Sequence, residues 1–399
     1  MSNHPTQTGN HQIAGGIMSK KVQENNQAQT SIKAMADASA DFLARNASEE
    51  DGAFYNDFEG LIRMRLVFKL LPLMSDLMTT RHQLFELYHT RNGIPVVRGK
   101  SKAKHFLECL ADTHASIAEL FPHYELNPYF EVFYSSAQSH GLSGLCLTIV
   151  DMRGEGAPVR VRQLNDCVAA IRAVTRSAEF KVCLKRYRRP IKQNFDSIMQ
   201  YATDLFRRHA KLCIVRLDLA YAQHFRSERK VSDQDTHLHR EALLAALNQG
   251  VFGPLVGYAW KLEVGKRKGS HYHCVFFFDG SKASHDVNIA QRIGLYWDHD
   301  ITQGMGTHYN CNARKQFYKK CFLGVVHHTD VEARNGFERY AEYMTKPDEF
   351  MRLALPGYRC IGKGQLGPLP AGHRSGRPRS AENGVSQWVS ASYSPIDIR

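Results

Sequence analysis

The sequence predicts an α+β protein, with a ferredoxin-like antiparallel sheet in the second half of the chain and a mainly helical region before it. Two observations lead to this fold class. In the second half, runs with strand alternation and runs with helical spacing follow one another in the order β-α-β-β-α-β. In the first half, apolar residues recur mostly at the 3.6-residue spacing of helices.

The first half divides into an arm and a helical domain. Residues 1–50 are rich in Gln, Asn, Ser and Ala and contain few large apolar residues, which predicts a flexible arm. Residues 51–185 predict a mainly helical N-terminal domain, and no motif in it indicates a role. Its strongest helical segments are 61–78 and 81–90, and residues 145–152 are a candidate strand.

The second half, residues 186–370, carries the predicted sheet. The basic run "LKRYRRPIKQ" at 184–193 leads into a helix whose apolar residues recur at helical spacing. The predicted elements then follow in this order: strand 212–221, helix 236–249, strand 256–264, strand 271–278, helix 285–298, strand 320–327 and helix 332–346. Residues 371–399 are rich in Gly, Ser, Pro and Arg, which predicts a flexible basic tail.

The charge balance indicates a polyanionic partner. The 399 residues contain 52 Lys and Arg against 39 Asp and Glu, and this net charge of +13 suits nucleic acid or an anionic membrane surface. No apolar run approaches the roughly 18 residues of a spanning helix. The first residues also lack the layout of a signal peptide, so we expect a cytoplasmic protein without a membrane partner. Nine cysteines without a CxxC pair argue against a zinc cage or a disulfide framework.

Two histidines lie in "GSHYHCVFFF" (269–278), a segment otherwise typical of a buried strand. Side chains alternate between the faces of a strand, so His271 and His273 point to the same side, one pleat apart. Two imidazoles in this arrangement can bind one ion. A lone pair of this kind is more often polar surface at a sheet edge, so the neighbouring strands have to decide between the two interpretations.

The strand 256–264 adds a carboxylate. If it forms a hairpin with 271–278 and the two strands bury their aromatic faces together, Glu263 shares the face of the histidines. Direct pairing of Glu263 with His271 or His273 implies a five- or seven-residue loop, which Gly265 and Gly269 make easy to close. This loop also places three cations at the edge of the site: Lys266, Arg267 and Lys268.

The strand 212–221 repeats the alternation, with apolar residues on one face and Arg216 and Asp218 on the other. In the predicted sheet it lies beside the histidine strand, so both residues are expected near the ion, either as a simple ion pair or as part of the site. Two imidazoles and one carboxylate leave coordination positions open, as in catalytic metal sites. Mg²⁺ or Mn²⁺ suits a phosphate substrate, and zinc stays an alternative.

The segment "RYAEYMTKPDEF" (339–350) adds a phenol. Tyr340, Tyr343 and Lys346 follow at i, i+3 steps of a helix that Pro347 ends. Tyr340 belongs to the apolar stripe of this helix and is expected in the core, whereas Tyr343 lies off the stripe and is the better nucleophile candidate. An unperturbed tyrosine ionises near pH 10, so attack on phosphate at neutral pH needs a cation and a metal. Lys346 and the ion are expected to supply them.

With these residues assembled, the chain resembles the HUH (His-hydrophobic-His) endonucleases, which initiate rolling-circle replication. It is most similar to the inovirus (filamentous-phage) replication-protein family and its prophage relatives. The likeness covers about residues 190–370 and rests on "CIVRLDLAY", "WKLEVGKRKGSHYHCVFFF", "IGLYWDHDITQGMGTHYNCN", "RYAEYMTK" and "GYRCIGKGQLGP".

This resemblance implies a role for each site residue. In such enzymes two histidines and an acidic residue hold a divalent ion, which implies His271, His273 and Glu263 as ligands. Tyr343 would be the nucleophile and Lys346 its helper. Some members use two tyrosines in alternation, and Tyr340 would be the second. It lies three residues from Tyr343, where four are expected for that arrangement.

The implied function is metal-dependent nicking and rejoining of single-stranded origin DNA, with a host helicase and polymerase as further partners. Candidate DNA contacts are Arg216, Asp218, Lys266, Arg267, Lys268, Arg314, Lys315, Lys319 and Lys320, with Phe317 and Tyr318 for base stacking. Other histidines are expected to be surface or hydrogen-bonded residues: His285, His299, His308, His327 and His328. Two alternatives stay open, a non-catalytic DNA-binding regulator on the same fold and a metal-dependent phosphohydrolase that uses water.

Overall fold

The computed structural model describes most of the chain between residues 58 and 367. The described ranges are 58–111, 118–119, 121–145, 147, 152–227, 231–265, 269–318 and 320–367, together with residue 393. Several predictions lie outside these ranges: the arm 1–50, the tail 371–399 apart from Tyr393, most of the candidate strand 145–152, and the cations Lys266, Arg267, Lys268 and Lys319.

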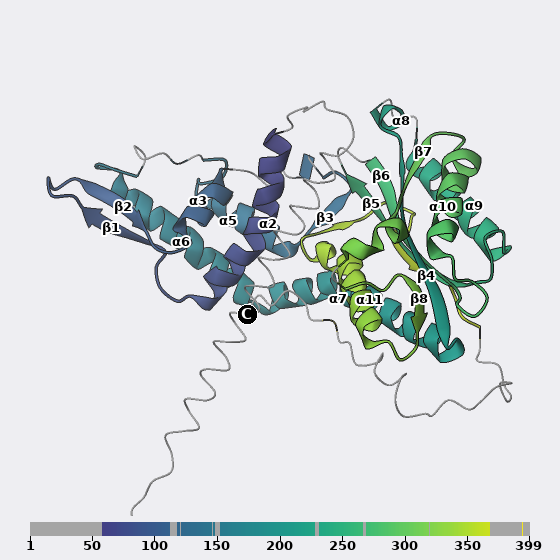
Figure 1. The fold of residues 1–399 in the computed structure, drawn as a ribbon. Helices are drawn as coiled ribbons and strands as arrows, with labels where there is room; N and C mark the ends of the chain where they lie inside the picture. Colours follow the sequence, from purple (N-terminus) through teal and green to yellow (C-terminus); the bar gives the residue numbers. More distant parts are fainter. Residues whose placement is uncertain are drawn as a thin grey trace, which may run out of the picture. The chain divides into compact units, whose positions relative to one another are not determined.

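The described residues form two compact units (Figure 1). The first unit holds the described parts up to residue 111 and from 129 to 177. The second holds those from 118 to 128 and from 178 to 367, with Tyr393. The candidate metal ligands and the candidate nucleophile Tyr343 all belong to the second unit.

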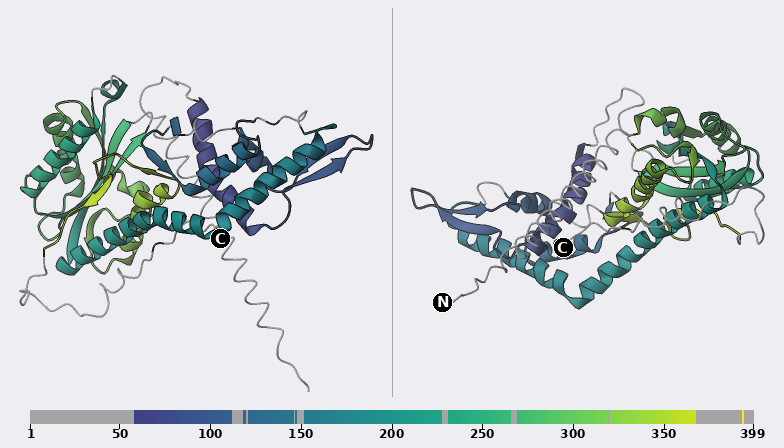
Figure 2. Two further views of the ribbon diagram at one scale, coloured as in Figure 1. Left: turned by 180° about the vertical axis from the view of Figure 1, so that it is seen from behind. Right: turned by 60° about the horizontal axis from the view of Figure 1, so that its bottom comes forward.

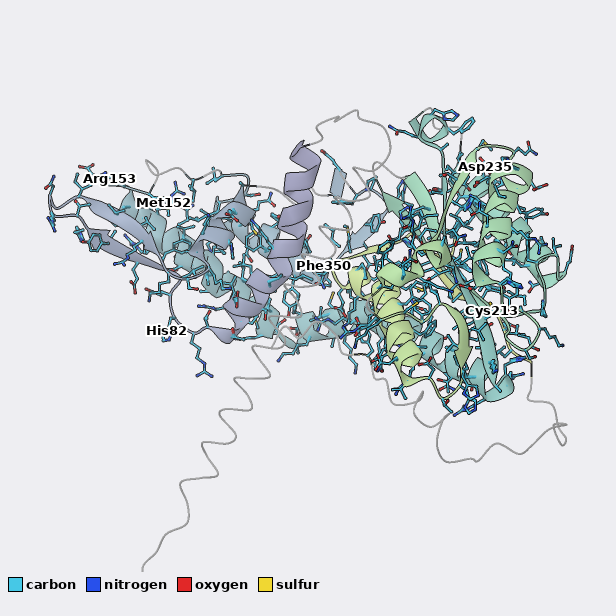
Figure 3. The ribbon with its side chains drawn as sticks, in the orientation of Figure 1. His82, Met152, Arg153, Cys213, Asp235 and Phe350 are labelled. Carbon is cyan, nitrogen blue, oxygen red and sulfur yellow. The ribbon has the colours of Figure 1, made fainter. Side chains whose placement is uncertain are left out.

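The first unit combines helices with one small hairpin. Its elements are α2 (Phe58–Thr79), β1 (Phe85–His89), β2 (Pro95–Gly99), α3 (Ala103–Leu110), α5 (Pro128–Ser139) and α6 (Ala157–Arg176). Phe85, Phe106 and Phe133 are fully buried and meet edge to face, which forms the centre of its core. Met152 and Arg153 lie beside β2, where the amide of Val97 donates to the carbonyl of Met152 at 2.8 Å (Figure 3).

The helix predicted over 61–78 is confirmed, but the helix predicted over 81–90 is wrong. That segment forms β1, which pairs antiparallel with β2. Asn92 and Gly93 explain the difference, because Asn-Gly is a strong hairpin signal and Gly93 adopts a φ of +74°. Residues 85–89 therefore form a strand that pairs with 95–99, although their apolar residues recur at helical spacing.

The second unit carries the larger sheet. Its elements, in chain order, are β3 (Tyr124–Leu126), α7 (Ala178–Arg208), β4 (Lys211–Tyr221), α8 (Gln223–Ser227), α9 (Asp233–Asn248), β5 (Leu255–Gly265), β6 (Gly269–Asp279), α10 (Asp286–Tyr296), the π-helical turn η1 (Trp297–Ile301), β7 (Gly306–Asn310), the 3₁₀ turn η2 (Cys311–Phe317), β8 (Gly324–His327), α11 (Val331–Thr345), the 3₁₀ turn η3 (Lys346–Glu349), β9 (Met351–Leu353) and β10 (Ile361–Lys363).

The larger sheet has six strands in the order β10-β5-β6-β4-β7, and β8 also pairs with β4. All of its pairings are antiparallel. The expected neighbourhood is therefore confirmed: the histidine strand β6 lies between β5, which carries Glu263, and β4, which carries Arg216 and Asp218. The protein is an α+β protein with an antiparallel sheet, as predicted.

Helices cover both faces of this sheet (Figure 2). On one face α9, α10 and η1 pack against apolar residues of β4, β5 and β6, among them Leu217, Trp260 and Phe276. On the other face α7 and α11 pack against Ile214 and Phe277, among others. The alternation that buries these two residues places the polar site on the α7/α11 face, at the other end of the same strands.

Some boundaries differ from the predictions. The basic run 184–193 does not precede a helix but lies inside α7, which begins at Ala178 and continues through Pro190. Proline removes one backbone hydrogen bond there, and the helix continues because residues such as Ile191 and Phe195 are buried in the core. The last predicted strand forms only over Gly324–His327, and β7, β9 and β10 were not predicted.

Candidate functional site

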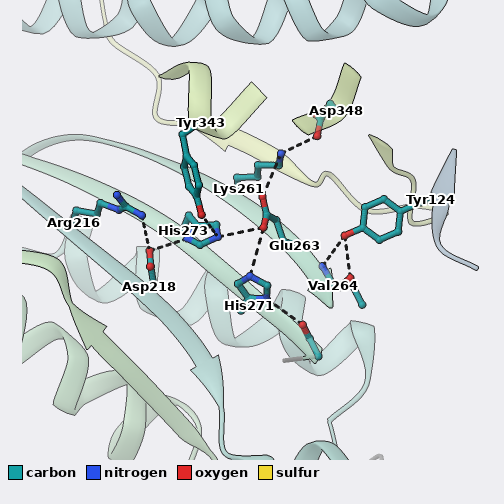
Figure 4. Close-up of polar contacts among 11 residues, drawn as sticks. Tyr124, Arg216, Asp218, Lys261, Glu263, Val264, His271, His273, Tyr343 and Asp348 are labelled. Atoms are coloured by element: carbon teal, nitrogen blue, oxygen red, sulfur yellow. Dashed lines mark hydrogen bonds and ion pairs between the residues drawn. The ribbon is translucent and has the colours of Figure 1, made fainter. Parts of the chain in front are cut away.

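Three neighbouring strands bring the predicted ligands together (Figure 4). In the β5/β6 hairpin Glu263 pairs directly with His271, and Lys261 pairs with His273. On the other side of β6, Asp218 of β4 also pairs with His273. Directly paired residues of antiparallel strands share a face, so these side chains point into the same space beneath α11.

Glu263, His271 and His273 form a cluster that can hold a metal ion. One ligand atom from each lies within 4.8 Å of the other two. Oε2 of Glu263 is 3.6 Å from Nε2 of His271 and 3.4 Å from Nε2 of His273. Both imidazoles therefore direct the same ring nitrogen towards one carboxylate oxygen.

The opposite ring nitrogens are held by the protein. Nδ1 of His273 donates to Oδ1 of Asp218 at 2.8 Å, and Nδ1 of His271 donates to the carbonyl oxygen of Gly269 at 3.1 Å. Such contacts orient metal-binding histidines and leave Nε2 for the ion. Nε2 of His271 is buried and has no hydrogen-bond partner among the described residues, so a ligand such as a cation would satisfy it. The donor set fits a divalent ion with open coordination positions.

Lys261 keeps Glu263 ionised. Its Nζ lies 3.5 Å from Oε1 of Glu263 and 2.8 Å from Oδ1 of Asp348. Burial alone would raise the pKa of Glu263, but Lys261 and then His273 outweigh it and hold that pKa well below its ordinary value. One oxygen of Glu263 thus faces Lys261, and the other faces the imidazoles.

Two neighbouring carboxylates raise the pKa of His273. Burial would lower its pKa, but the carboxylates of Asp218 and Glu263 outweigh burial and raise the pKa to about 9. Metal ligation needs the neutral imidazole, so Nε2 of His273 would have to be deprotonated to hold a divalent ion.

Helix α11 places Tyr343 over the cluster. The side chain of Asp330 caps its N-terminus by accepting from the amide of Ala333, and the helix ends at Thr345, two residues before Pro347, as predicted. The hydroxyl oxygen of Tyr343 lies 3.3 Å from Nε2 of His273, and the two ring centroids are 5.3 Å apart. The candidate nucleophile is therefore next to a candidate ligand 70 residues away in the chain.

Tyr340 is part of the core beside this site. Only 3% of it is exposed, as expected from its place in the apolar stripe of α11. Its ring stacks on that of Tyr343 with the centroids 6.4 Å apart. Its hydroxyl is buried and makes no hydrogen bond within the described part of the chain, so a role in supporting the ring of Tyr343 suits it better than one as a second nucleophile.

Arg216 is the cation that contacts both phenol rings. Its guanidinium carbon lies 4.9 Å from the ring centroid of Tyr340 and 5.3 Å from that of Tyr343. Nη2 of Arg216 is 3.5 Å from Oδ1 of Asp218, which in turn accepts from His273. Alternation along the strand predicted the face of Arg216, but its contact with the two rings depends on how α11 packs.

Lys346 forms an ion pair with Glu342. Its Nζ donates to Oε1 of Glu342 at 2.6 Å, because it follows the end of α11 and reaches back one turn. Sequence reasoning missed Lys261 and Asp348, whose ion pair holds Glu263 in place. A lysine on the same predicted face as Glu263, two residues away, was the available signal.

The environment of Tyr343 raises its pKa well above the ordinary value. Burial is the largest cause, and the negative charges of Glu263 and Asp218 add to it, while Arg216 acts in the opposite direction. A divalent cation held by Glu263 would offset the negative charge next to the phenol. The phenol therefore needs such a cation before it can act as a nucleophile near neutral pH.

Tyr124 fixes the end of β5 beside the site. Its hydroxyl donates to the carbonyl of Val264 at 3.0 Å and accepts from the amide of the same residue at 3.1 Å. These two bonds hold the strand directly after Glu263, where the hairpin loop begins (Figure 4). Nothing in the local sequence of Tyr124 indicated this contact.

Of the other predicted DNA contacts, Tyr318 is half-buried and packs against the core that α7 and α11 form with the sheet. Phe317 is 71% exposed, whereas Lys315 forms an ion pair with Asp286. His308 is not part of the triad, since its Nδ1 lies 2.6 Å from Oδ2 of Asp298.

Residues 175–364 match the family model described as the YagK/YfjJ C-terminal domain. This range contains every residue of the triad and its neighbours from Arg216 to Lys346. No curated protein and no solved structure gives a significant match to the chain. Within the described ranges, no helix is both long and apolar enough to cross a membrane.

Proposed function

We propose that the second unit is a nuclease domain of the HUH type, with ferredoxin-like topology, which nicks and rejoins single-stranded DNA through a 5′-phosphotyrosine. The observation that carries this proposal is the position of the Tyr343 hydroxyl, 3.3 Å from Nε2 of His273, which belongs to the Glu263–His271–His273 cluster. The strand order β8-β4-β6-β5 with two intervening helices agrees with a βαββαβ domain.

The proposed reaction is a transesterification. The phenolic oxygen of Tyr343 attacks the phosphorus of a phosphodiester and loses its proton. A new O–P bond links Tyr343 to the 5′ phosphate as the bond from phosphorus to the 3′ oxygen breaks. The departing 3′ oxygen takes up a proton and becomes a free hydroxyl, which can prime a polymerase. Because the link conserves an ester bond, attack by a later 3′ hydroxyl reverses the step without ATP.

The chain's own residues orient the reacting groups. Glu263, His271 and His273 would hold Mg²⁺ or Mn²⁺, which when bound polarises the scissile phosphate and stabilises charge in the transition state. Asp218 orients His273 through its 2.8 Å contact. Arg216 lies against the ring of Tyr343 and offers a cation to a phosphate placed there.

A second candidate is a metal-dependent phosphohydrolase in which water attacks. The raised pKa of Tyr343 favours it, because a phenol that holds its proton is a poor nucleophile. The two reactions differ in one product: hydrolysis leaves no bond between protein and DNA.

One experiment separates the two. The full chain is incubated with single-stranded DNA labelled at its 3′ end and Mn²⁺, denatured in detergent and run on a gel. The proposal predicts a labelled protein band that survives boiling and is absent from Tyr343→Phe. Cleaved DNA without such a band would favour the phosphohydrolase, and no cleavage by a folded, metal-loaded protein would favour a DNA-binding regulator.

A further inference from the structure

A cleft of about 230 Å³ lies between α7 and the edge strand β10 in the second unit. Its polar lining residues come from both elements and from the segments that flank β10: Asn194, Ser197, Arg359, Lys363 and Gln365. Among the described residues that line it, none carries a carboxylate. The cleft therefore offers two cations, two amides and a hydroxyl, with no acid to repel an anion.

The two cations have no acidic partner in the described part of the chain. Neither Arg359 nor Lys363 forms an ion pair with a described carboxylate, although many other cations of the unit do, such as Lys315 with Asp286. Nζ of Lys363 lies 4.7 Å from the ring centroid of Tyr201, which steadies the lysine without neutralising it. Both charges remain available to an anion that enters the cleft.

Two glycines let β10 and the segment after it pack closely against their neighbours. A Cβ atom at Gly364 would lie 2.5 Å from the hydroxyl oxygen of Tyr201 on α7, and one at Gly362 would lie 2.6 Å from the ring of Trp260 on the opposite face of the sheet. A side chain at either position would force these neighbours apart.

The size of the cleft suits part of a polymer. Pockets for whole small-molecule ligands usually measure about 300–1,000 Å³. At about 230 Å³ this cleft is smaller, and it is open to solvent, so it fits one unit of an extended chain better than an enclosed metabolite.

The cleft lies on the same face of the sheet as the metal-binding cluster. In the β10/β5 pairing Ile361 pairs with Lys261, and Lys363 pairs with Ala259. Directly paired residues share a face, so Lys363 lies on the face that carries Lys261 and, two residues further, Glu263. The cleft and the cluster thus lie on the same face of the sheet, on the directly paired strands β10, β5 and β6.

From these observations we infer that the cleft between α7 and β10 binds the sugar-phosphate backbone of the single-stranded DNA that is cut at the metal-binding cluster. This inference rests on the proposed function, since it takes the DNA strand as the ligand. Arg359 and Lys363 contact phosphate oxygens, and the amides of Asn194 and Gln365 hydrogen-bond to the same nucleotides.

The test compares two double variants of the full chain by binding to a labelled single-stranded oligonucleotide across a range of salt. Arg359→Gln/Lys363→Gln removes the cations of the cleft. Lys282→Gln/Arg292→Gln is the matched control, with the same loss of charge at exposed positions near and on α10. Each phosphate contact to a single strand contributes about 0.7 to the slope of log affinity against log salt, so two contacts contribute about 1.4.

The cleft variant should therefore lose about 1.4 from the slope, while the control keeps the slope of the parent protein. Between about 50 and 200 mM salt, the parent should lose about sevenfold more affinity than the cleft variant. An equal slope in the cleft variant and the parent would overturn the inference, and so would the absence of DNA binding. Displacement of the DNA by poly-glutamate at matched charge would point to an acidic protein partner instead.

The two proposals fail in different ways. If the parent and the variants bind DNA with the predicted slopes but the parent forms no covalent adduct, the proposed nicking reaction is wrong and DNA binding in the cleft is supported. If the adduct forms at Tyr343 and the cleft variant keeps the salt slope of the parent, the proposed nicking reaction is supported and DNA binding in the cleft is wrong.

Discussion

The hydroxyl oxygen of Tyr343 lies 3.3 Å from Nε2 of His273, while Nδ1 of the same imidazole donates to Asp218 at 2.8 Å. One histidine thus connects the candidate nucleophile on α11 to a carboxylate on β4.

The two tyrosines of α11 should behave differently when each loses its hydroxyl. Tyr343→Phe should abolish the covalent adduct without unfolding the domain. Tyr340→Phe should keep the adduct, and its free energy of unfolding should stay within about 1 kcal/mol of the parent or rise, because it removes a buried hydroxyl that lacks a partner among the described residues. Gel assays and urea denaturation measure both effects. Loss of the adduct in Tyr340→Phe would indicate a mechanism with two tyrosines.

Asp218 should matter for metal binding although it is not a ligand. Asp218→Asn weakens the contact that orients His273, and the loss of such a partner typically lowers metal affinity by about 10–100-fold. Titration calorimetry with Mn²⁺ measures the change. The matched control is Asp298→Asn, which alters a similar Asp–His pair with His308 outside the triad. Equal Mn²⁺ affinities in the two variants would show that Asp218 does not contribute to metal binding.

Removal of one partner of the buried ion pair between Lys261 and Asp348 should lower the free energy of unfolding. Lys261→Met leaves the carboxylates of Asp348 and Glu263 without their cation, and breaking a buried pair in this way costs about 3–5 kcal/mol. Lys261→Met combined with Asp348→Leu should recover part of that loss, because the second buried charge is removed too.

Urea denaturation measures these changes in the free energy of unfolding. Lys192→Met provides the control, since Lys192 pairs with Asp196 on the exposed side of α7 and such pairs contribute less than about 1 kcal/mol. A loss in Lys261→Met no larger than in this control would show that the buried pair contributes little.

Arg216 should contribute more to the reaction than Lys346. Arg216→Gln removes the cation that contacts the ring of Tyr343 and should lower the single-turnover rate of adduct formation by about 10²–10³-fold. Lys346→Gln should lower it by less than about tenfold, because Nζ of Lys346 is held by Glu342. Rapid-quench measurements at saturating DNA give both rates. A larger loss of rate in Lys346→Gln than in Arg216→Gln would support Lys346 as the residue that assists Tyr343.

Alternation along strands predicted much of the candidate site. The faces of β5 and β6 follow from burying Trp260 with Cys274, and this choice places Glu263 on the side of His271 and His273. The pairing of Glu263 with His271, out of two alternatives, was not determined by the pattern. It follows from the tight hairpin in which Gly265 pairs with Gly269 and Gly269 has a φ of +59°.

Other features depend on packing that no local pattern encodes. The spacing in α11 separated buried Tyr340 from Tyr343, but the contact of both rings with Arg216 requires the helix to dock over β4. For the same reason the pairing of Lys346 with Glu342 and of Lys261 with Asp348 was not predicted. The helical spacing of residues 81–90 predicted a helix, whereas the Asn92-Gly93 turn pairs β1 with β2 in a hairpin.

The most direct test is to identify the residue that carries the DNA. After reaction with single-stranded DNA and Mn²⁺, nuclease and protease digestion followed by mass spectrometry locates the residual nucleotide phosphate on a peptide. The account predicts this phosphate on the phenolic oxygen of Tyr343. A nucleotide on any other residue, or cleaved DNA with every tyrosine unmodified, would contradict it.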